Sequence, residues 1–176
     1  MFEKSALDYL YRERDHVTPL VVIMCGLAGS GKTTFSQKMD NKGFVRLSID
    51  EEVWSANGRY GIDYPIEKYR EYLNKAHLRL RNKLVRLIHN KEQVVVDSSF
   101  WRKAERVEYK QLIEAAGGKR CMIYLKVSHA DLLNRLEVRS NRFDANAAFP
   151  ITEDILTGFL NSFEVPKDEG EIVIEY

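Results

Sequence analysis

Apolar runs and amphipathic stretches alternate along the chain. Predicted strands cover residues 20–25, 44–49, 93–97, 120–127 and 171–176. Predicted helices cover residues 3–14, 33–39, 64–90, 102–116, 129–139 and 152–163, where apolar residues recur with helical spacing. The first strand is apolar throughout, as expected of a strand that is buried on both faces of a parallel sheet. The alternation predicts an α/β three-layer sandwich around a mainly parallel five-stranded sheet.

The pattern shows no boundary between separate domains. It holds no internal repeat, low-complexity tract or convincing linker, and 176 residues are enough for one domain with a substantial core. The sequence therefore predicts a single domain over residues 1–176. Residues 1–18 are expected to form an N-terminal helical extension, and residues from about 139 to 150 a lid loop.

Composition and charge indicate which binding partners and which cellular compartment the protein is expected to have. Lys and Arg number 27 against 26 Asp and Glu, so the net charge of +1 gives no overall attraction to nucleic acid or to an anionic membrane. Cys25 and Cys121 lie in apolar runs and are expected to be free thiols of a reducing compartment. No apolar stretch approaches the ~18 residues that cross a bilayer, and the charged N-terminal stretch lacks the apolar core of a signal peptide. These features predict a cytoplasmic protein and leave the oligomeric state open.

A glycine-rich loop follows the first strand. The segment 26–33, GLAGSGKT, matches G-x-x-x-x-G-K-[ST] and lies between a strand and a helix. Its backbone amides and the start of the helix are expected to surround a polyphosphate, with Lys32 on the β- and γ-phosphates and the Thr33 hydroxyl on Mg²⁺. ATP is favoured over GTP, since no Asn-Lys-x-Asp segment is present. The predicted nucleotide-binding residues are Gly26, Leu27, Ala28, Gly29, Ser30, Gly31, Lys32, Thr33 and Thr34.

Two carboxylates follow other predicted strands. Asp97 ends the third strand and is expected to hold Mg²⁺ directly or through water; a turn-forming role at the strand end is the alternative. The next residue is Ser98, where many hydrolytic motor ATPases have a glutamate, and this favours phosphate transfer over hydrolysis. Asp50 follows the second strand and is placed to accept the proton of an attacking hydroxyl. The alternative for Asp50 is a helix N-cap or first-turn acid.

Three arginines recur with helical spacing. Arg135, Arg139 and Arg142 stand at i, i+4 and i+7, so one helical face is predicted to carry all three. Such a row, followed by a polar loop, suits a lid that brings cations over a transferring phosphoryl group. A solvated basic face is the alternative interpretation.

Taken together, these segments resemble a known family of small P-loop kinases. Its members include the kinase domain of polynucleotide kinase, chloramphenicol phosphotransferase, the zeta toxins and many uncharacterised bacterial AAA domain kinases. The matching pieces span residues 20 to 172 and are GLAGSGKTT, LSIDEEVW, VVVDSSFWRKAER, LLNRLEVRSNR and ITEDILTGFLNSFEVPKDEG.

The resemblance implies a P-loop NTPase fold of the nucleoside-monophosphate-kinase type, with strand order 2-3-1-4-5, that uses ATP and Mg²⁺. It assigns phosphate and magnesium contacts to Lys32 and Thr33, the general base to Asp50 and a second acid to Asp97. It assigns the lid to Arg135 and Arg139, with Arg142 in the same lid. Val53 stands where the polynucleotide kinase domain has an arginine.

The acceptor is the open question of the sequence. Its site is expected at about 51–75 and 98–106, a region rich in aromatic residues that either stack on a ring or belong to the core: Trp54, Tyr60, Tyr64, Tyr69, Tyr72, Phe100 and Trp101. A basic stripe over 75–86 is interpreted as solvated surface, with nucleic-acid binding as the minority alternative. The favoured function is transfer of the γ-phosphate of ATP to a hydroxyl of a small-molecule or nucleotide-like acceptor. The alternatives are an ATP-binding switch or slow ATPase and a 5′-hydroxyl polynucleotide kinase.

Overall fold

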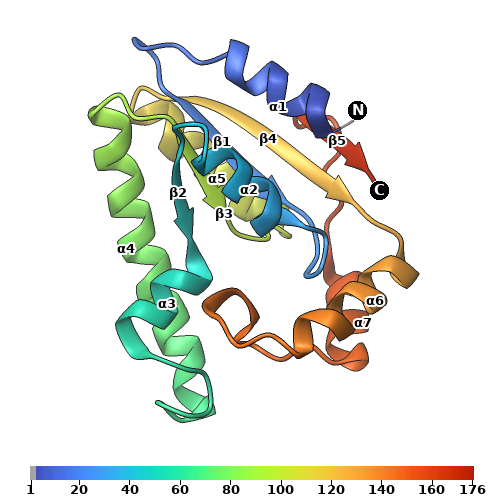
Figure 1. Cartoon of the computed structure of the whole chain (residues 1–176). Coiled ribbons are helices and arrows are strands. Elements are labelled where there is room, and N and C mark those ends of the chain that lie inside the picture. Colours follow the sequence, from blue (N-terminus) through green and yellow to red (C-terminus); the bar gives the residue numbers. More distant parts are fainter. Residues whose placement is uncertain (1–2) are drawn as a thin grey trace.

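A five-stranded parallel sheet lies at the centre of the computed structural model, which describes residues 3–176 (Figure 1). The strands are β1 (Leu20–Cys25), β2 (Val45–Ser48), β3 (Val94–Asp97), β4 (Lys119–Lys126) and β5 (Glu171–Glu175). Their order is β2-β3-β1-β4-β5, and every neighbouring pair is parallel. The predicted fold class and strand order are confirmed. The sheet is parallel throughout rather than mainly so.

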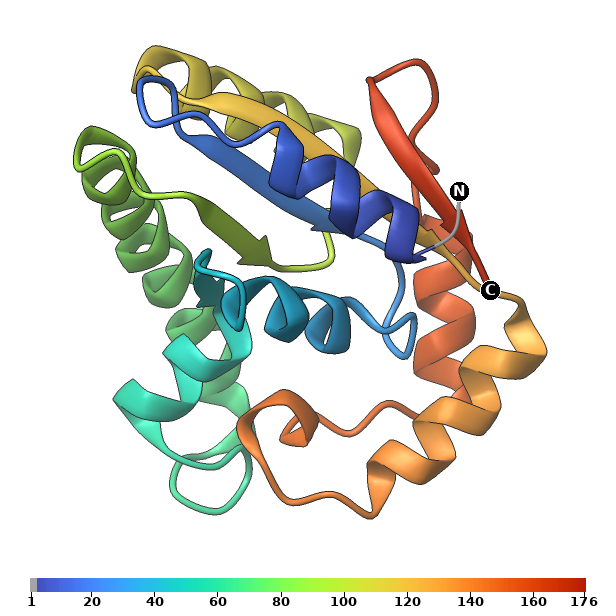
Figure 2. The ribbon, with the colours of Figure 1, turned by 45° about the horizontal axis from the view of Figure 1, so that its top comes forward.

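Helices cover both faces of this sheet. They are α1 (Glu3–Arg12), α2 (Lys32–Asp40), α3 (Ile49–Asn57), α4 (Tyr69–His89), α5 (Lys103–Ala115), α6 (His129–Ser140) and α7 (Glu153–Ser162). Short 3₁₀ turns occupy Ile66–Lys68 and Ala145–Ala147. Figure 2 shows α1 on one side of the sheet and α5 on the other.

The residues of β1 explain the layered core. All six are fully buried, and successive side chains point to opposite faces of the sheet. Val21, Ile23 and Cys25 pack in a cluster with apolar residues of α4 and α5. Leu20, Val22 and Met24 pack in a second cluster with residues of α1 and α2. A strand that is apolar on both faces therefore requires helices on both faces, which is the predicted three-layer sandwich.

The predicted N-terminal extension contains α1, whose Ala6 and Leu10 are fully buried in the second cluster. Residues 1 and 2 of that extension lie outside the described part of the chain. Cys25 is buried, Cys121 is half-buried, and both are free thiols as predicted. Across residues 3–176, the helices are all too short or too polar to cross a membrane.

Several element boundaries differ from the sequence-based prediction by a few residues, and two of them have a clear local cause. The second strand ends at Ser48 instead of 49, because the Ser48 hydroxyl accepts a hydrogen bond from Glu51 N and starts α3. The long helix begins at Tyr69 instead of 64, since Pro65 is extended and a 3₁₀ turn follows it. In α7, the predicted cap is confirmed: Thr152 Oγ1 accepts a hydrogen bond from Ile155 N at 3.3 Å.

Candidate active site

The glycine-rich loop joins the carboxyl end of β1 to α2. Gly26 has φ 148°, and a Cβ there would lie 2.7 Å from Ser30 Oγ and 3.0 Å from the Leu125 carbonyl oxygen. Gly31 has φ 99° and precedes α2, whose first turn receives no side-chain cap. Glycine is therefore required at both positions to bring backbone amides around a ligand.

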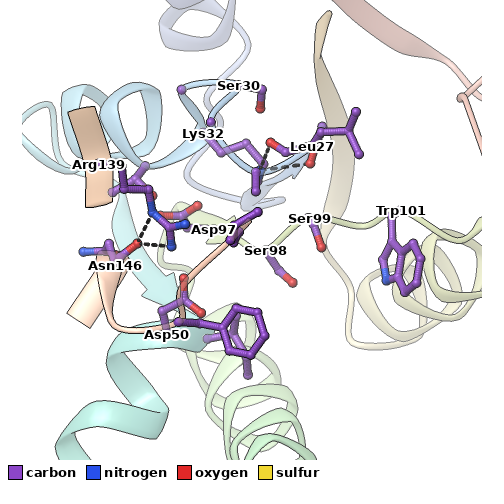
Figure 3. Close-up of a pocket in the computed structure, with 18 of the residues that line it drawn as sticks. Leu27, Ser30, Lys32, Asp50, Asp97, Ser98, Ser99, Trp101, Arg139 and Asn146 are labelled. Carbon is purple, nitrogen blue, oxygen red and sulfur yellow. Dashed lines mark hydrogen bonds between the residues drawn. The ribbon is translucent and has the colours of Figure 1, made fainter. Parts of the chain in front are cut away.

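Lys32 lies over this loop. Its Nζ donates hydrogen bonds to the carbonyl oxygens of Gly26 at 2.9 Å and Leu27 at 2.8 Å (Figure 3). Burial lowers the pKa of Lys32, and the nearby Asp97 and Asp50 carboxylates oppose that shift. Ser30 Oγ is buried and has no hydrogen-bond partner among residues 3–176. A free helix N-terminus, a cationic amine and an orphaned hydroxyl fit a polyphosphate.

Asp50 lies in the first turn of α3, directly after β2. It is not the N-cap of this helix, because Ser48 occupies that position. Asp50 is therefore either a catalytic base or an acidic residue that stabilises the first turn of the helix. Burial raises the pKa of Asp50 to about 6, and the charge of Asp97 adds to the rise, while Arg139, Lys32 and Arg46 oppose it. A carboxyl group with a pKa near neutrality can exchange a proton readily at physiological pH.

Asp97 ends β3 directly beside Ser48 of β2 in the sheet register. Its Oδ2 accepts hydrogen bonds from Arg46 Nη2 at 2.6 Å and from Ser36 Oγ at 3.1 Å. Among residues 3–176, every side-chain hydrogen bond that Asp97 accepts goes to Oδ2 and not to Oδ1. One carboxylate oxygen of Asp97, Oδ2, is therefore held by a cation and a hydroxyl group.

The three arginines do not share one helical face. Arg135 and Arg139 lie on α6, but α6 ends at Ser140, so the predicted row of three is wrong for Arg142. Arg142 instead forms an ion pair with Asp144 at 2.8 Å in the loop that follows. The helix ends there because the polar 141–144 segment makes local turns, and Asp144 then caps the next 3₁₀ turn.

From α6, Arg135 contacts the glycine-rich loop and Arg139 contacts the predicted lid loop. Arg135 Nη1 donates to the Ser30 carbonyl oxygen at 3.4 Å, and its guanidinium lies 5.2 Å from the centre of the Tyr176 ring. Arg139 donates to the Asn146 carbonyl oxygen through Nε at 3.0 Å and Nη2 at 2.6 Å. Both guanidinium groups line the same cavity as Lys32.

Asn146 connects the predicted lid loop to the edge of the sheet, although no sequence motif singles it out. Its Nδ2 donates to Glu51 Oε1 at 3.1 Å, and its Oδ1 accepts from Arg46 Nη2 at 3.2 Å and Ser48 Oγ at 3.3 Å. Next to it, the Phe149 ring stacks on Tyr69 of α4 with 5.0 Å between ring centres. The loop is thus docked on α3 and α4 by both polar and aromatic contacts.

A cavity of about 790 Å³ brings the predicted site residues together. Its walls contain every predicted nucleotide-binding residue from 26 to 34, both carboxylates Asp50 and Asp97, and all three arginines. At the end lined by α4, α5 and α7, which we call the α4–α5 end, the lining residues are Leu73, His77, Trp101, Glu105 and Phe159. Figure 3 shows Trp101 across the cavity from Arg139, with Ser98 and Ser99 between them.

The predicted acceptor region contributes part of this wall. Of its aromatic residues, Tyr69 and Trp101 line the large cavity, whereas Phe100 is core. Trp54, Tyr60 and Tyr64 surround a much smaller hollow. His77 and Phe159 lie outside the predicted ranges. The basic stripe is exposed at every position, as expected of solvated surface: Lys75, Arg79, Lys83 and Arg86.

A buried ion pair holds the segment that carries Ser98, Ser99 and Trp101. Phe100 has φ 44°, a strained value for this residue type, and its carbonyl oxygen accepts a hydrogen bond from Arg106 Nη1 at 3.0 Å. Arg106 is 1% exposed and forms an ion pair with Glu169 at 2.7 Å. Arg106 therefore holds the backbone of this cavity-lining segment in place.

Fold and loop together define the class: a phosphate loop at the carboxyl edge of a parallel sheet of order 2-3-1-4-5 is the P-loop kinase fold. A family model described as an AAA domain matches residues 21–166, and the chain belongs to this AAA domain family. The predicted membership in a small P-loop kinase family is thereby confirmed. No curated protein matches the sequence significantly.

Several solved structures share the fold. A protein from Chloroflexus aurantiacus described as a "putative kinase" has a TM-score of 0.70 and 19% identity, covering 90% of this chain and 85% of its own. The Mycobacterium tuberculosis APS kinase in complex with AMPPNP and APS has a TM-score of 0.60 and 17% identity, covering 90% and 88%. A chain of the Pnkp1/Rnl/Hen1 RNA repair complex has a TM-score of 0.64 and 17% identity, covering 86% and 47%.

Proposed function

We propose that the chain is an ATP-dependent phosphotransferase that moves the γ-phosphoryl group of ATP to a hydroxyl group of an acceptor. The observation that carries the proposal is Asp50, a carboxylate with a pKa of about 6 in the same cavity as the phosphate loop. Transfer of a phosphoryl group to an alcohol is assisted by a base that takes the alcohol's proton, and Asp50 is the carboxylate proposed for that step.

The reaction assigns a task to each group. The acceptor oxygen forms a bond to the γ-phosphorus, the bond from that phosphorus to the β–γ bridging oxygen breaks, and ADP leaves. Asp50 takes the proton of the acceptor hydroxyl. Lys32, Arg135 and Arg139 line the cavity around the phosphate loop, where they would stabilise the charge on the phosphoryl oxygens. Arg142 would add a weaker contribution, because Asp144 already pairs with it.

A magnesium ion fits the donor set of the site. The Thr33 hydroxyl and Asp97 Oδ1 are hard oxygen ligands of the kind that Mg²⁺ prefers, and both residues line the cavity. When bound, Mg²⁺ neutralises charge on the β- and γ-phosphate oxygens. Thr33 and Asp97 are the residues that would hold it. Arg46 supports this role because its hydrogen bond to Asp97 Oδ2 orients the carboxylate.

The test is the Asp50→Asn substitution, which keeps the size of the side chain but greatly weakens it as a base. We expect unchanged ATP affinity and phosphate transfer that is at least ~100-fold slower. ADP release would be measured with and without pooled hydroxyl acceptors, beside a nucleotide titration. Glu52→Gln is the matched control, since Glu52 lies on the same helix and pairs with Arg79 outside the cavity.

The outcomes separate the competing functions. Full acceptor-dependent activity in Asp50→Asn would end the proposed mechanism. An ATP-binding switch or slow ATPase would show basal ADP release that no acceptor accelerates and that survives Asp50→Asn.

A further inference from the structure

We propose that the acceptor is an uncharged or amine-bearing alcohol with an apolar ring, bound at the α4–α5 end with its ring on Trp101 and Phe159 and its polar group toward Glu105. This inference rests on the phosphotransferase function proposed above and adds the chemical class of its acceptor. Three features of the cavity carry it: the distribution of cations, the acidic wall and the apolar surface.

In the described part of the chain, the cations that line the cavity all come from the start of α2, from α6 and from the loop after α6, and none comes from the α4–α5 end. Among residues 3–176 they are Lys32 at the start of α2 and the arginines of α6 and the lid loop: Arg135, Arg139 and Arg142. Lys32 and Arg135 contact the phosphate loop, where the triphosphate is expected, and Arg139 lies near Asp50. Among the described residues, the α4–α5 end itself supplies no cation to an acceptor that carries its own phosphate, sulfate or carboxylate group there.

The cations near the α4–α5 end do not line the cavity. Arg81 pairs with Glu108 at 3.0 Å, and the buried Arg106 pairs with Glu169. The Arg102 guanidinium lies over the Trp101 ring at 4.7 Å from its centre. An anionic group held at the α4–α5 end would therefore lie beside Glu105 with no cation of residues 3–176 in that part of the wall, and an unpaired charge out of water is costly.

The polar groups that line the α4–α5 end are a carboxyl group and an imidazole, not cations. Glu105 lines the cavity, and burial, followed by the charge of Glu108, raises its pKa. Burial also lowers the pKa of His77, with Arg81 adding to the effect, so the imidazole stays neutral. A neutral imidazole and a carboxyl group can hydrogen-bond a hydroxyl, and a carboxylate can pair with an ammonium group.

Apolar surface completes the wall. The Trp101 and Phe159 rings meet edge to face, with 5.9 Å between their centres, and Leu73 of α4 lines the same end. Buried aromatic surfaces of this kind bind a ring of a ligand through area and stacking. The end therefore combines a hydrophobic surface with few polar groups, as small-molecule sites do.

The first experiment measures charge selectivity directly, with three ligands of similar size: 2-phenylethylamine, 2-phenylethanol and phenylacetate. Trp54→Phe leaves Trp101 as the single tryptophan, since the chain has two. The fluorescence of Trp101 is titrated with each ligand while AMPPNP and Mg²⁺ occupy the phosphate side. We expect 2-phenylethylamine to bind at least about tenfold more tightly than phenylacetate, with 2-phenylethanol between them.

Variants assign the selectivity to one residue. Glu105→Gln should reduce the affinity for the amine toward that of the alcohol. Glu114→Gln should leave the order unchanged, because Glu114 lies on the same helix but does not line the cavity. Phenylacetate binding as tightly as the amine, or no saturable binding of any of the three, would overturn the inference.

The second experiment follows labelled phosphate into matched acceptors: nucleosides against their 3′-monophosphates, amino sugars against uronic acids, and a 5′-hydroxyl oligonucleotide. Transfer to the uncharged and amine-bearing members is expected. Transfer confined to the anionic members or the oligonucleotide would overturn the acceptor class and leave the kinase intact. Charge-selective binding of the three ligands without transfer to any acceptor would count against the phosphotransferase itself, and the acceptor assignment would fall with it.

Discussion

Arg46 Nη2 lies 2.6 Å from Asp97 Oδ2, and the two side chains are only 7% and 5% exposed. The pair joins β2 to β3 at the edge of the sheet where the phosphate loop lies. Arg46 also donates to Glu51 and to Asn146, so one guanidinium organises Asp97, the first turn of α3 and the lid loop. A buried cation that serves three groups at once is both a structural and a positioning element.

Removal of this cation should cost much more than removal of a surface one. Arg46→Met leaves Asp97 as an uncompensated buried carboxylate, and we expect a loss of about 3–5 kcal/mol in the free energy of unfolding. Lys126→Met is the control, since Lys126 and Glu175 form an exposed pair whose loss should change stability only slightly. Urea unfolding measures both. Equal losses in the two variants would show that the Arg46 pair does not stabilise the site.

Nucleotide binding should stabilise the fold through Lys32. ATP with Mg²⁺ at a hundred times its dissociation constant should add about 2.7 kcal/mol to the free energy of unfolding. Lys32→Ala should weaken or abolish this gain, because the amine that now bonds to Gly26 and Leu27 carbonyl oxygens is the one expected on the phosphates. Thermal melts with and without nucleotide give the measurement. No shift with any nucleotide in the wild type would contradict the nucleotide site.

Activity should depend on the protonation of Asp50. The base must be ionised, so kcat/KM should fall as the pH drops below about 6, the raised pKa of this carboxyl group. The contribution of Asp50 to the free energy of unfolding should change in the opposite direction with pH. The folded-state pKa exceeds the ordinary value of 3.8, so the native state binds the proton more tightly, and this group's contribution to stability declines as the pH rises from about 4 to about 6.

Asp50→Asn should remove that part of the pH dependence of stability. Denaturant midpoints at a series of pH values, for wild type and Asp50→Asn, check the second effect independently of any acceptor. Parallel pH dependences in the two proteins would mean that the Asp50 pKa is not raised.

The lid arginines should affect turnover more than ATP binding. Arg139→Ala should lower kcat by about 10²-fold, with a smaller rise in KM for ATP, if its guanidinium stabilises the transferring phosphoryl group. Arg135→Ala should behave similarly. Arg142→Ala should have the smallest effect, because Asp144 already holds that side chain. Unchanged turnover in all three variants would assign them to a solvated face.

Asn146 should control how firmly the lid loop is docked. Asn146→Ala removes the side-chain contacts with Glu51, Arg46 and Ser48, so we expect faster proteolytic cleavage within residues 141–149 and a raised KM. Asn141→Ala is the matched control, an exposed asparagine whose side chain bonds only locally, to Glu137 O. Limited proteolysis of the two variants under the same conditions makes the comparison. Equal cleavage rates would show that Asn146 does not hold the loop.

The sequence alone determined the elements and most of the predicted site. Continuous apolar strands, the Gly26–Thr33 motif and carboxylates at the ends of strands are local signals, because a strand buried on both faces and a loop around phosphate each need particular residues at fixed spacing. They were sufficient for the sandwich and, with the family resemblance, for the strand order. They also singled out Asp50, Asp97 and Arg139, which line one cavity in the structure.

Only the tertiary structure decided what these groups contact. Arg46 and Asp97 are 51 positions apart, and Asn146 meets Ser48 across 98, distances over which periodicity carries no signal. Arg142 does not lie on the predicted helical face, because local turns end α6 at Ser140. His77 and Glu105 came together in one wall because two helices, separated along the chain by β3, pack on the same face of the sheet. Local spacing determines an element and its motifs, whereas the packing of elements determines which charges are paired, which are buried and which are left to a ligand.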